Sequence, residues 1–149
     1  MKVARLYSPT VLSTRRSAPI AEAAAAMRRF NVGCLLVMED GDGGLVGIVT
    51  DRDLALQGFA SEATHVGAFM TPVLATVHLE SDVHEALHVM RAHGVRRLVV
   101  TDSRGEVRGV LSIDDIVDGL SADLAAAAAV LKGGIDTQAS GLGDVKVGG

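Results

Sequence analysis

The fold of this chain is decided by two short stretches, GIVTDRD at residues 47–53 and GVLSIDD at residues 109–115. Each begins with a glycine and apolar residues typical of a buried strand, and each then places Thr or Ser three residues before Asp. A hydroxyl side chain with a carboxylate three positions later is typical of a capping box at a helix start. Both stretches, the signature segments below, therefore predict a strand that runs directly into a helix.

The similarity extends beyond the signature segments. Met27-Arg28 recurs as Met90-Arg91, 63 residues later, and after the next turn the offset is 62, because Gly47 corresponds to Gly109. Self-similarity at a fixed period indicates a repeated supersecondary unit. The chain is predicted to be a tandem duplication with a tail: repeat 1 at residues 1–60, repeat 2 at residues 61–120 and the tail at residues 121–149.

Each repeat alternates helical and strand patterns. Val83, Ala86 and Met90 lie on one helical face, and Leu98–Val100 is a continuous apolar strand. The expected helices cover residues 19–30, 51–59, 82–93 and 112–120, and the expected strands cover 35–38, 45–49, 98–100 and 107–111. This is an α/β (α+β) fold in which each repeat is a small three-stranded sheet with flanking helices. Because one such unit is marginal alone, we expect a pseudo-twofold pair packed sheet to sheet.

The tail has a different composition. Five consecutive alanines at residues 125–129 predict a separate helix over Asp123–Lys132, ended by Gly133-Gly134. Residues 135–149 are expected to be mobile. Packing against the pair or against a second chain explains an alanine-rich helix, and nothing in the tail suggests chemistry.

Composition excludes several classes of function. Fourteen basic and 18 acidic residues give a net charge of −4, and aromatic residues make up 3%, which disfavours nucleic-acid binding. One cysteine excludes an internal disulfide, and no apolar run is long enough for a membrane span, so we expect a soluble, cytoplasmic protein. His84 and His88 are expected to be solvated rather than metal ligands. We find no catalytic constellation and predict that the chain is not an enzyme.

The signature segments permit two interpretations. A capping box satisfies backbone amides at a helix start and needs no ligand. The same amides can bind a phosphate, and a neighbouring carboxylate can accept hydrogen bonds from two ribose hydroxyls. Two such segments in register within a duplicated fold favour the binding interpretation.

The ensemble of motifs resembles the cystathionine-β-synthase (CBS) domain. It comprises both signature segments, the Met70-Thr71-Pro72 lead-in and the Gly94–Val100 strand entry, and the resemblance covers about residues 1–120. It implies a CBS pair, or Bateman module, that binds an adenosyl effector such as AMP, ADP, ATP, NAD or S-adenosylmethionine and requires no cofactor. It also implies a homodimer formed through helices, and an output to an unknown effector protein or to its own oligomer.

The resemblance also implies two clefts between the repeats, in which Asp binds the ribose, Ser or Thr faces phosphate and apolar residues enclose adenine. One cleft would use Val110, Ser112 and Asp115 with Leu12, Val32, Gly33 and Cys34. The other would use Ile48, Thr50, Arg52 and Asp53 with Ala75, Val95 and Arg96, and Arg96 and Arg97 would contact phosphate.

The clefts are not expected to be equal. Gly33-Cys34 in repeat 1 corresponds to Arg96-Arg97 in repeat 2, and Asp114 adds a negative charge beside Asp115. The Asp53 cleft is therefore expected to bind a phosphorylated nucleotide more tightly. The alternative is a protein-interaction module with degenerate clefts, in which Thr50 and Ser112 act only as caps.

Overall fold

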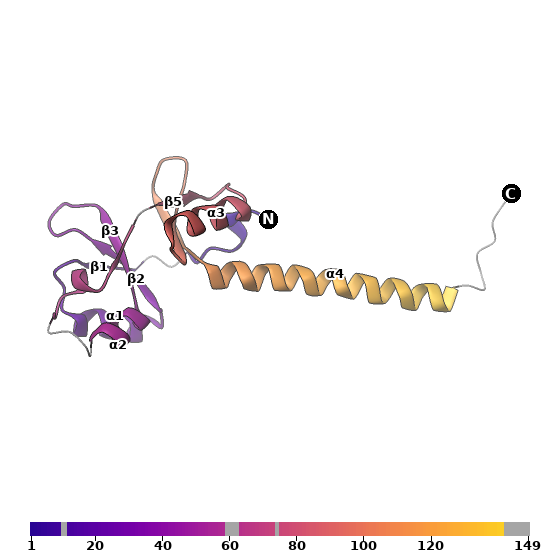
Figure 1. The fold of residues 1–149 in the computed structure, drawn as a ribbon, viewed down its shortest axis with the longest axis horizontal. Coiled ribbons are helices and arrows are strands. Elements are labelled where there is room, and N and C mark those ends of the chain that lie inside the picture. The colour runs from indigo at the N-terminus through magenta and orange to yellow at the C-terminus, as the bar shows by residue number, and fades with distance from the viewer. Residues whose placement is uncertain (10–11, 59–62, 74, 142–149) are drawn as a thin grey trace. The chain divides into compact units, whose positions relative to one another are not determined.

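The structure, a computed structural model, describes residues 1–9, 12–58, 63–73 and 75–141 (Figure 1). The chain forms two compact units, Met1–Ser112 and Ile113–Gly149. Its helices are α1 (Ile20–Phe30), α2 (Asp51–Gly58), α3 (Val83–His93) and α4 (Ile113–Gly141), with short 3-10 turns at Val3–Arg5 and Val66–Ala68. Its strands are β1 (Ser13–Arg15), β2 (Cys34–Met38), β3 (Leu45–Thr50), β4 (Thr71–Pro72), β5 (Thr76–His78), β6 (Arg97–Thr101) and β7 (Val107–Ser112).

The predicted mixed α/β fold with two small sheets is confirmed. One sheet has the order β1-β2-β3-β4 and the other the order β5-β6-β7. In each, a parallel pair precedes an antiparallel hairpin, with a register shift at Val37/Met38 and again at Val100/Thr101. Helices α1 and α2 lie beside each other against the first sheet (Figure 1).

The first sheet has four strands rather than the expected three. Thr71 and Pro72, near the start of repeat 2, form β4 by pairing with Ile48 and Gly47. The corresponding residue near the start of repeat 1, Ser8, makes an isolated bridge to Val110 in β7. The extra strand therefore comes from the segment that leads into the other repeat.

The two lead-in segments, residues 1–9 and 63–73, are exchanged between the repeats. The Val3 amide donates to the Ser81 carbonyl at 2.9 Å, and the Val66 amide donates to the Ala18 carbonyl at 2.9 Å. Both valines are fully buried. Each repeat thus completes its core with a segment that the sequence assigns to the other, which explains why both sheets belong to one compact unit.

Two buried clusters show how this unit is filled. The first is formed mainly by repeat 1 and includes Val66 and Phe69 from the lead-in segment of repeat 2. The second, the inter-sheet cluster, consists of Leu36, Ile48, Val99 and Val110, one residue from each of β2, β3, β6 and β7. The two sheets therefore pack face to face, as the sequence predicted.

The predicted boundary inside the tail is wrong. The expected helices at 112–120 and 123–132 are one uninterrupted helix, α4, which continues through Gly133 and Gly134 (Figure 1). A glycine inside a helix costs only about 1 kcal/mol, so it does not have to end one. Residues 135–141, expected to be mobile, belong to α4. The remainder of that expected mobile segment, 142–149, and Phe59, the expected end of α2, lie outside the described residues.

Candidate functional site

The first signature segment closes a capping box at the start of α2. The Thr50 amide donates to Asp53 Oδ2 at 2.9 Å, and the Asp53 amide donates to Thr50 Oγ1 at 3.1 Å. Thr50 is buried, with 7% of its surface exposed, whereas Asp53 is half-buried. The structural interpretation of this segment is therefore realised, and the Asp53 carboxylate directs Oδ2 at the helix start.

The residues around this box come from neighbouring strands. Cys34 lies opposite Thr50 in the β2–β3 ladder, and the Asp51 amide donates to the Gly33 carbonyl at 3.0 Å. Arg52 is exposed in the first turn of α2. The strand register places Cys34, and the hydrogen bond from the Asp51 amide places Gly33, beside the first signature segment.

The second signature segment has a related environment. Arg97 is half-buried and lies opposite Ser112 at the start of the β6–β7 ladder. Arg96 beside it is exposed. Ser112 is half-buried at the end of β7, and Asp115 is half-buried in the first turn of α4, next to exposed Asp114. The register therefore places a guanidinium side chain where repeat 1 has Cys34.

The inter-sheet cluster connects the two signature segments. Ile48 and Val110, one from each segment, belong to this cluster, and Cys34 packs against it. Thr50 and Ser112 each follow two residues later on their strands. The face-to-face packing therefore brings together the strands that lead into both segments.

The other predicted cleft residues lie in separate segments of the chain. Leu12 and Val32 pack against the repeat 1 core, and the Leu12 carbonyl accepts a hydrogen bond from the Leu36 amide at 2.9 Å. Ala75 and Val95 are half-buried, and the Val95 amide donates to the Met90 carbonyl at 3.0 Å. The assignment of these residues to one cleft or the other remains a prediction.

The glycine at the head of each signature segment has a steric reason that the sequence did not reveal. A Cβ at Gly109 would collide with the carbonyl oxygen of Ser8, and a Cβ at Gly47 would lie 2.6 Å from Met70 Sδ and 3.0 Å from the Thr71 carbonyl oxygen. The exchanged lead-in segments pass directly over these glycines. Tyr7, Ser8, Met70 and Thr71 therefore border the signature segments, although the sequence analysis singled out only Met70 and Thr71, as part of the lead-in motif.

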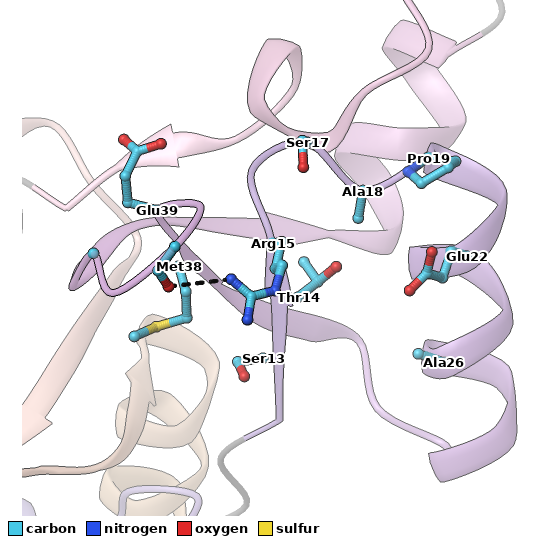
Figure 2. A pocket seen from close by; sticks show the side chains of 12 residues that line it. Ser13, Thr14, Arg15, Ser17, Ala18, Pro19, Glu22, Ala26, Met38 and Glu39 are labelled. Carbon is cyan, nitrogen blue, oxygen red and sulfur yellow. Dashed lines mark hydrogen bonds between the residues drawn. The ribbon is translucent and has the colours of Figure 1, made fainter.

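A cavity of about 600 Å³ lies elsewhere on repeat 1, beside β1 (Figure 2). Glu22 and Ala26 of α1 line one side, and Met38 and Glu39 line the other (Figure 2). Arg15 Nη1 donates to the Gly41 carbonyl at 3.3 Å across its edge. None of the residues predicted to bind a nucleotide lines this cavity.

Asp82, which lies outside the signature segments, has a structural role. The Asp82 side chain caps α3 by accepting from the His84 amide at 3.0 Å, and the Met1 amino group lies 3.2 Å from its Oδ2, which together lower the pKa of Asp82. His84 and His88 are both exposed.

Among the described residues, no group of three or more His, Cys, Asp or Glu side chains is arranged to bind a metal ion. No described helix has the length and apolar character required to span a bilayer.

Comparison with known proteins identifies the class. The CBS domain family model matches residues 3–57 and 66–122, one match per repeat. The chain therefore belongs to the CBS domain family and contains a tandem pair of these domains. Among its relatives is YlbB of Bacillus subtilis, 37% identical over 98 residues, a match that covers 64% of this chain and 66% of that protein.

Solved structures show the same arrangement. The CBS domain pair of protein MJ0100, in complex with 5′-methylthioadenosine and S-adenosyl-L-methionine, is 25% identical with a TM-score of 0.69; the match covers 83% of this chain and 98% of that one. A putative signal-transduction protein with CBS domains from Burkholderia ambifaria is 32% identical with a TM-score of 0.64, covering 81% of this chain and 92% of that one.

Proposed function

We propose that this chain is a regulatory module that binds an adenosyl ligand between its two CBS domains. One observation carries the proposal: Ile48 and Val110 both belong to the inter-sheet cluster. This cluster brings together the strands that lead into the two signature segments. The adenosyl compounds bound by the CBS pair of MJ0100 support the chemical class of the ligand.

In the Asp53 cleft, the capping box and the ligand would share one carboxylate. Asp53 Oδ2 accepts the Thr50 amide at 2.9 Å, and an ionised carboxylate has about four lone-pair sites on its two oxygens. Oδ1 can therefore accept hydrogen bonds from ribose hydroxyls while Oδ2 continues to cap α2. The positive end of the α2 dipole, with the exposed guanidinium of Arg52, favours a phosphate nearby.

Charge favours this cleft over the second one for phosphorylated ligands. The first turn of α2 contains Asp51, Arg52 and Asp53, whereas the first turn of α4 contains Asp114 and Asp115 without a basic residue. We propose that Arg96 and Arg97 contribute phosphate contacts to the Asp53 cleft, since guanidinium groups pair with phosphate oxygens in a bidentate manner.

The second candidate is a protein-interaction module with degenerate clefts. Thr50 favours it, because its side chain is buried and its Oγ1 already accepts the Asp53 amide at 3.1 Å. In that case Asp53 is only a cap, and its removal costs about 1 kcal/mol without affecting any ligand.

The output of the module would pass to another protein. We propose a non-catalytic, cytoplasmic homodimer whose ligand state changes its affinity for an effector protein. A ligand acts in this way only through its different affinities for two states of the module.

A thermal-shift panel tests the proposal. The purified chain is measured with AMP, ADP, ATP, NAD, S-adenosylmethionine and no ligand, with and without magnesium. A ligand at 100 times its dissociation constant stabilises the fold by about 2.7 kcal/mol, which raises the Tm by several degrees. We expect a shift with at least one compound that is lost in Asp53→Ala and kept in Asp42→Ala, an exposed turn position. No shift with any compound would support the interaction module instead.

A further inference from the structure

Exposed apolar side chains are concentrated on one helix. Of the seven large hydrophobic residues found exposed among the described residues, five lie on α4: Val117, Leu120, Leu124, Val130 and Leu131. Their exposed fractions range from 46% to 75%. Scattered single exposed apolar residues are normal on a protein surface, but a concentration of them on one element indicates an interaction site.

Four of these residues, all but Val130, define a seam together with Ile113 and Ala127. Ile113, Val117, Leu120, Leu124, Ala127 and Leu131 are separated alternately by four and three positions along α4. This 3.5-residue period is the heptad pattern of a coiled coil, and it places all six residues on one stripe. We call this stripe the α4 seam.

The glycines of α4 make it a weak helix unless its apolar face is packed against a partner. Gly119, Gly133 and Gly134 lie inside the helix, and each costs about 1 kcal/mol relative to alanine. Every residue from Ser121 to Gly134 is exposed. A helix in water gains most of its stability from packing of an apolar face. The seam therefore needs a partner that covers it along its length.

Charge selects the partner. Asp114, Asp115, Asp118 and Asp123 lie in the N-terminal part of α4, and Lys132 is the only basic residue between positions 113 and 141. A second copy in the antiparallel direction places its Lys132 beside the acidic half of the first copy and opposes the two helix dipoles. A parallel copy would instead place the two acidic halves side by side.

We propose that the α4 seam binds the α4 seam of a second copy as an antiparallel two-stranded coiled coil. In the register that places Ile113 opposite the partner's Leu131, Leu120 packs against the partner's Leu124 and Val117 packs against the partner's Ala127. Every seam position then has an apolar partner. Apart from Ile113, this surface lies outside the signature segments, and the proposal does not depend on the adenosyl ligand.

Two matched substitutions test the pairing. Leu124→Asp places a charge in the seam, whereas Ala129→Asp places the same charge on the exposed opposite face. We expect wild type and Ala129→Asp to sediment at twice the chain mass, and Leu124→Asp to dissociate about a hundredfold more readily, because each dimer loses two buried leucines. A monomeric wild type, or a Leu124→Asp dimer as tight as wild type, would overturn the proposal. Circular dichroism melts of both variants show whether the CBS domains remain folded.

Cysteine crosslinking tests the direction. Val117→Cys and Ala127→Cys are made separately in a Cys34→Ser background, mixed and oxidised. The antiparallel pair predicts a mixed disulfide between the two variants. Disulfides formed only between identical variants would contradict it and indicate a parallel pair. Because Leu124→Asp lies outside the proposed clefts, its ligand-induced thermal shift reports separately on the adenosyl proposal.

Discussion

The two repeats share their backbone arrangement but differ in the side chains at the edges of the proposed clefts. In both, a lead-in segment from the other repeat passes over the first glycine of the signature segment. Helices α1 and α3 both end in a left-handed residue, Asn31 (φ 51°) in repeat 1 and Gly94 (φ 64°) in repeat 2. At the strand entry, however, Cys34 lies opposite Thr50, and Arg97 lies opposite Ser112. The duplication therefore preserves the residues that the fold needs, while the side chains beside the two signature segments differ.

The largest expected effect comes from a side chain placed where a lead-in segment passes over the first glycine of a signature segment, a feature that both repeats share. In Gly109→Ala the new methyl group meets a backbone carbonyl, which cannot rotate away, so we expect a loss of about 3 kcal/mol or more in the free energy of unfolding. In Gly47→Ala the nearest atom is the flexible Met70 thioether, and we expect about 1 kcal/mol. Denaturant unfolding measures both. Gly44→Ala, where no atom lies within 4 Å, is the control and is expected to change little. An equal loss of unfolding free energy in Gly109→Ala and Gly44→Ala would contradict the close passage of the lead-in segment over Gly109.

The next largest effect tests the difference between Arg97 in repeat 2 and Cys34 at the equivalent position of repeat 1. Arg97→Ala is expected to weaken AMP binding about 10- to 100-fold, because hydrogen bonds to charged groups contribute about 1.5–3 kcal/mol. Binding of 5′-methylthioadenosine, which has no phosphate, is expected to stay nearly unchanged. Equilibrium dialysis with both ligands measures the ratio, and Arg104→Ala, in an exposed turn, is the control. An equal loss for both ligands would argue against a phosphate contact.

A smaller effect compares the helix ends. Gly94→Ala forces a left-handed conformation on a residue with a Cβ and is expected to cost about 1 kcal/mol. Asn31→Gly, at the corresponding position of repeat 1, is expected to be neutral or slightly stabilising, since glycine adopts that conformation freely. Paired thermal melts distinguish the two. A destabilised Asn31→Gly would mean that the asparagine side chain contributes more than its backbone conformation.

The smallest effect concerns the hairpin turns and appears only in acid. Partial removal from water raises the pKa of Asp102, but hydrogen bonds from the Arg108 side chain and the Glu106 and Arg104 amides bring it below its ordinary value. Its stabilisation is therefore fully present above about pH 4, the unfolded value, and is lost as the pH falls through the lower folded value.

Asp102→Asn should consequently flatten the decline in unfolding free energy below about pH 4, as measured by urea titrations at successive pH values. Asp42→Asn, in the exposed turn of repeat 1, is the control. Parallel acid profiles for wild type and Asp102→Asn would show that these hydrogen bonds do not depend on the charge of Asp102.

Much of the fold could be predicted because it is encoded locally. The expected strand at residues 45–49 is β3 (Leu45–Thr50), and the expected helix at residues 19–30 is α1 with Pro19 as its N-cap. The exchange of lead-in segments could not be predicted, because three-residue turns carry no periodicity and their pairing is decided by packing. The continuous α4 was missed because a Gly-Gly pair favours a helix end, although each glycine costs only about 1 kcal/mol when the helix continues through it.

The candidate site was less predictable than the fold. The capping box at Thr50 and Asp53 followed from residue spacing alone. The partners of Gly47 and Gly109 did not, since they come from segments distant in sequence. Spacing specifies contacts within an element, whereas the borders of a cleft between repeats depend on how separate elements meet.

Isothermal titration of wild type, Asp53→Ala and Asp115→Ala with the adenosyl ligand selected by the thermal-shift panel tests the central claim most directly. If each signature segment binds through its own Asp, each variant loses one class of site and retains the other, while its unfolding free energy falls by only about 1 kcal/mol. Unchanged stoichiometry and affinity in both variants would contradict the claim and leave Asp53 and Asp115 as structural caps.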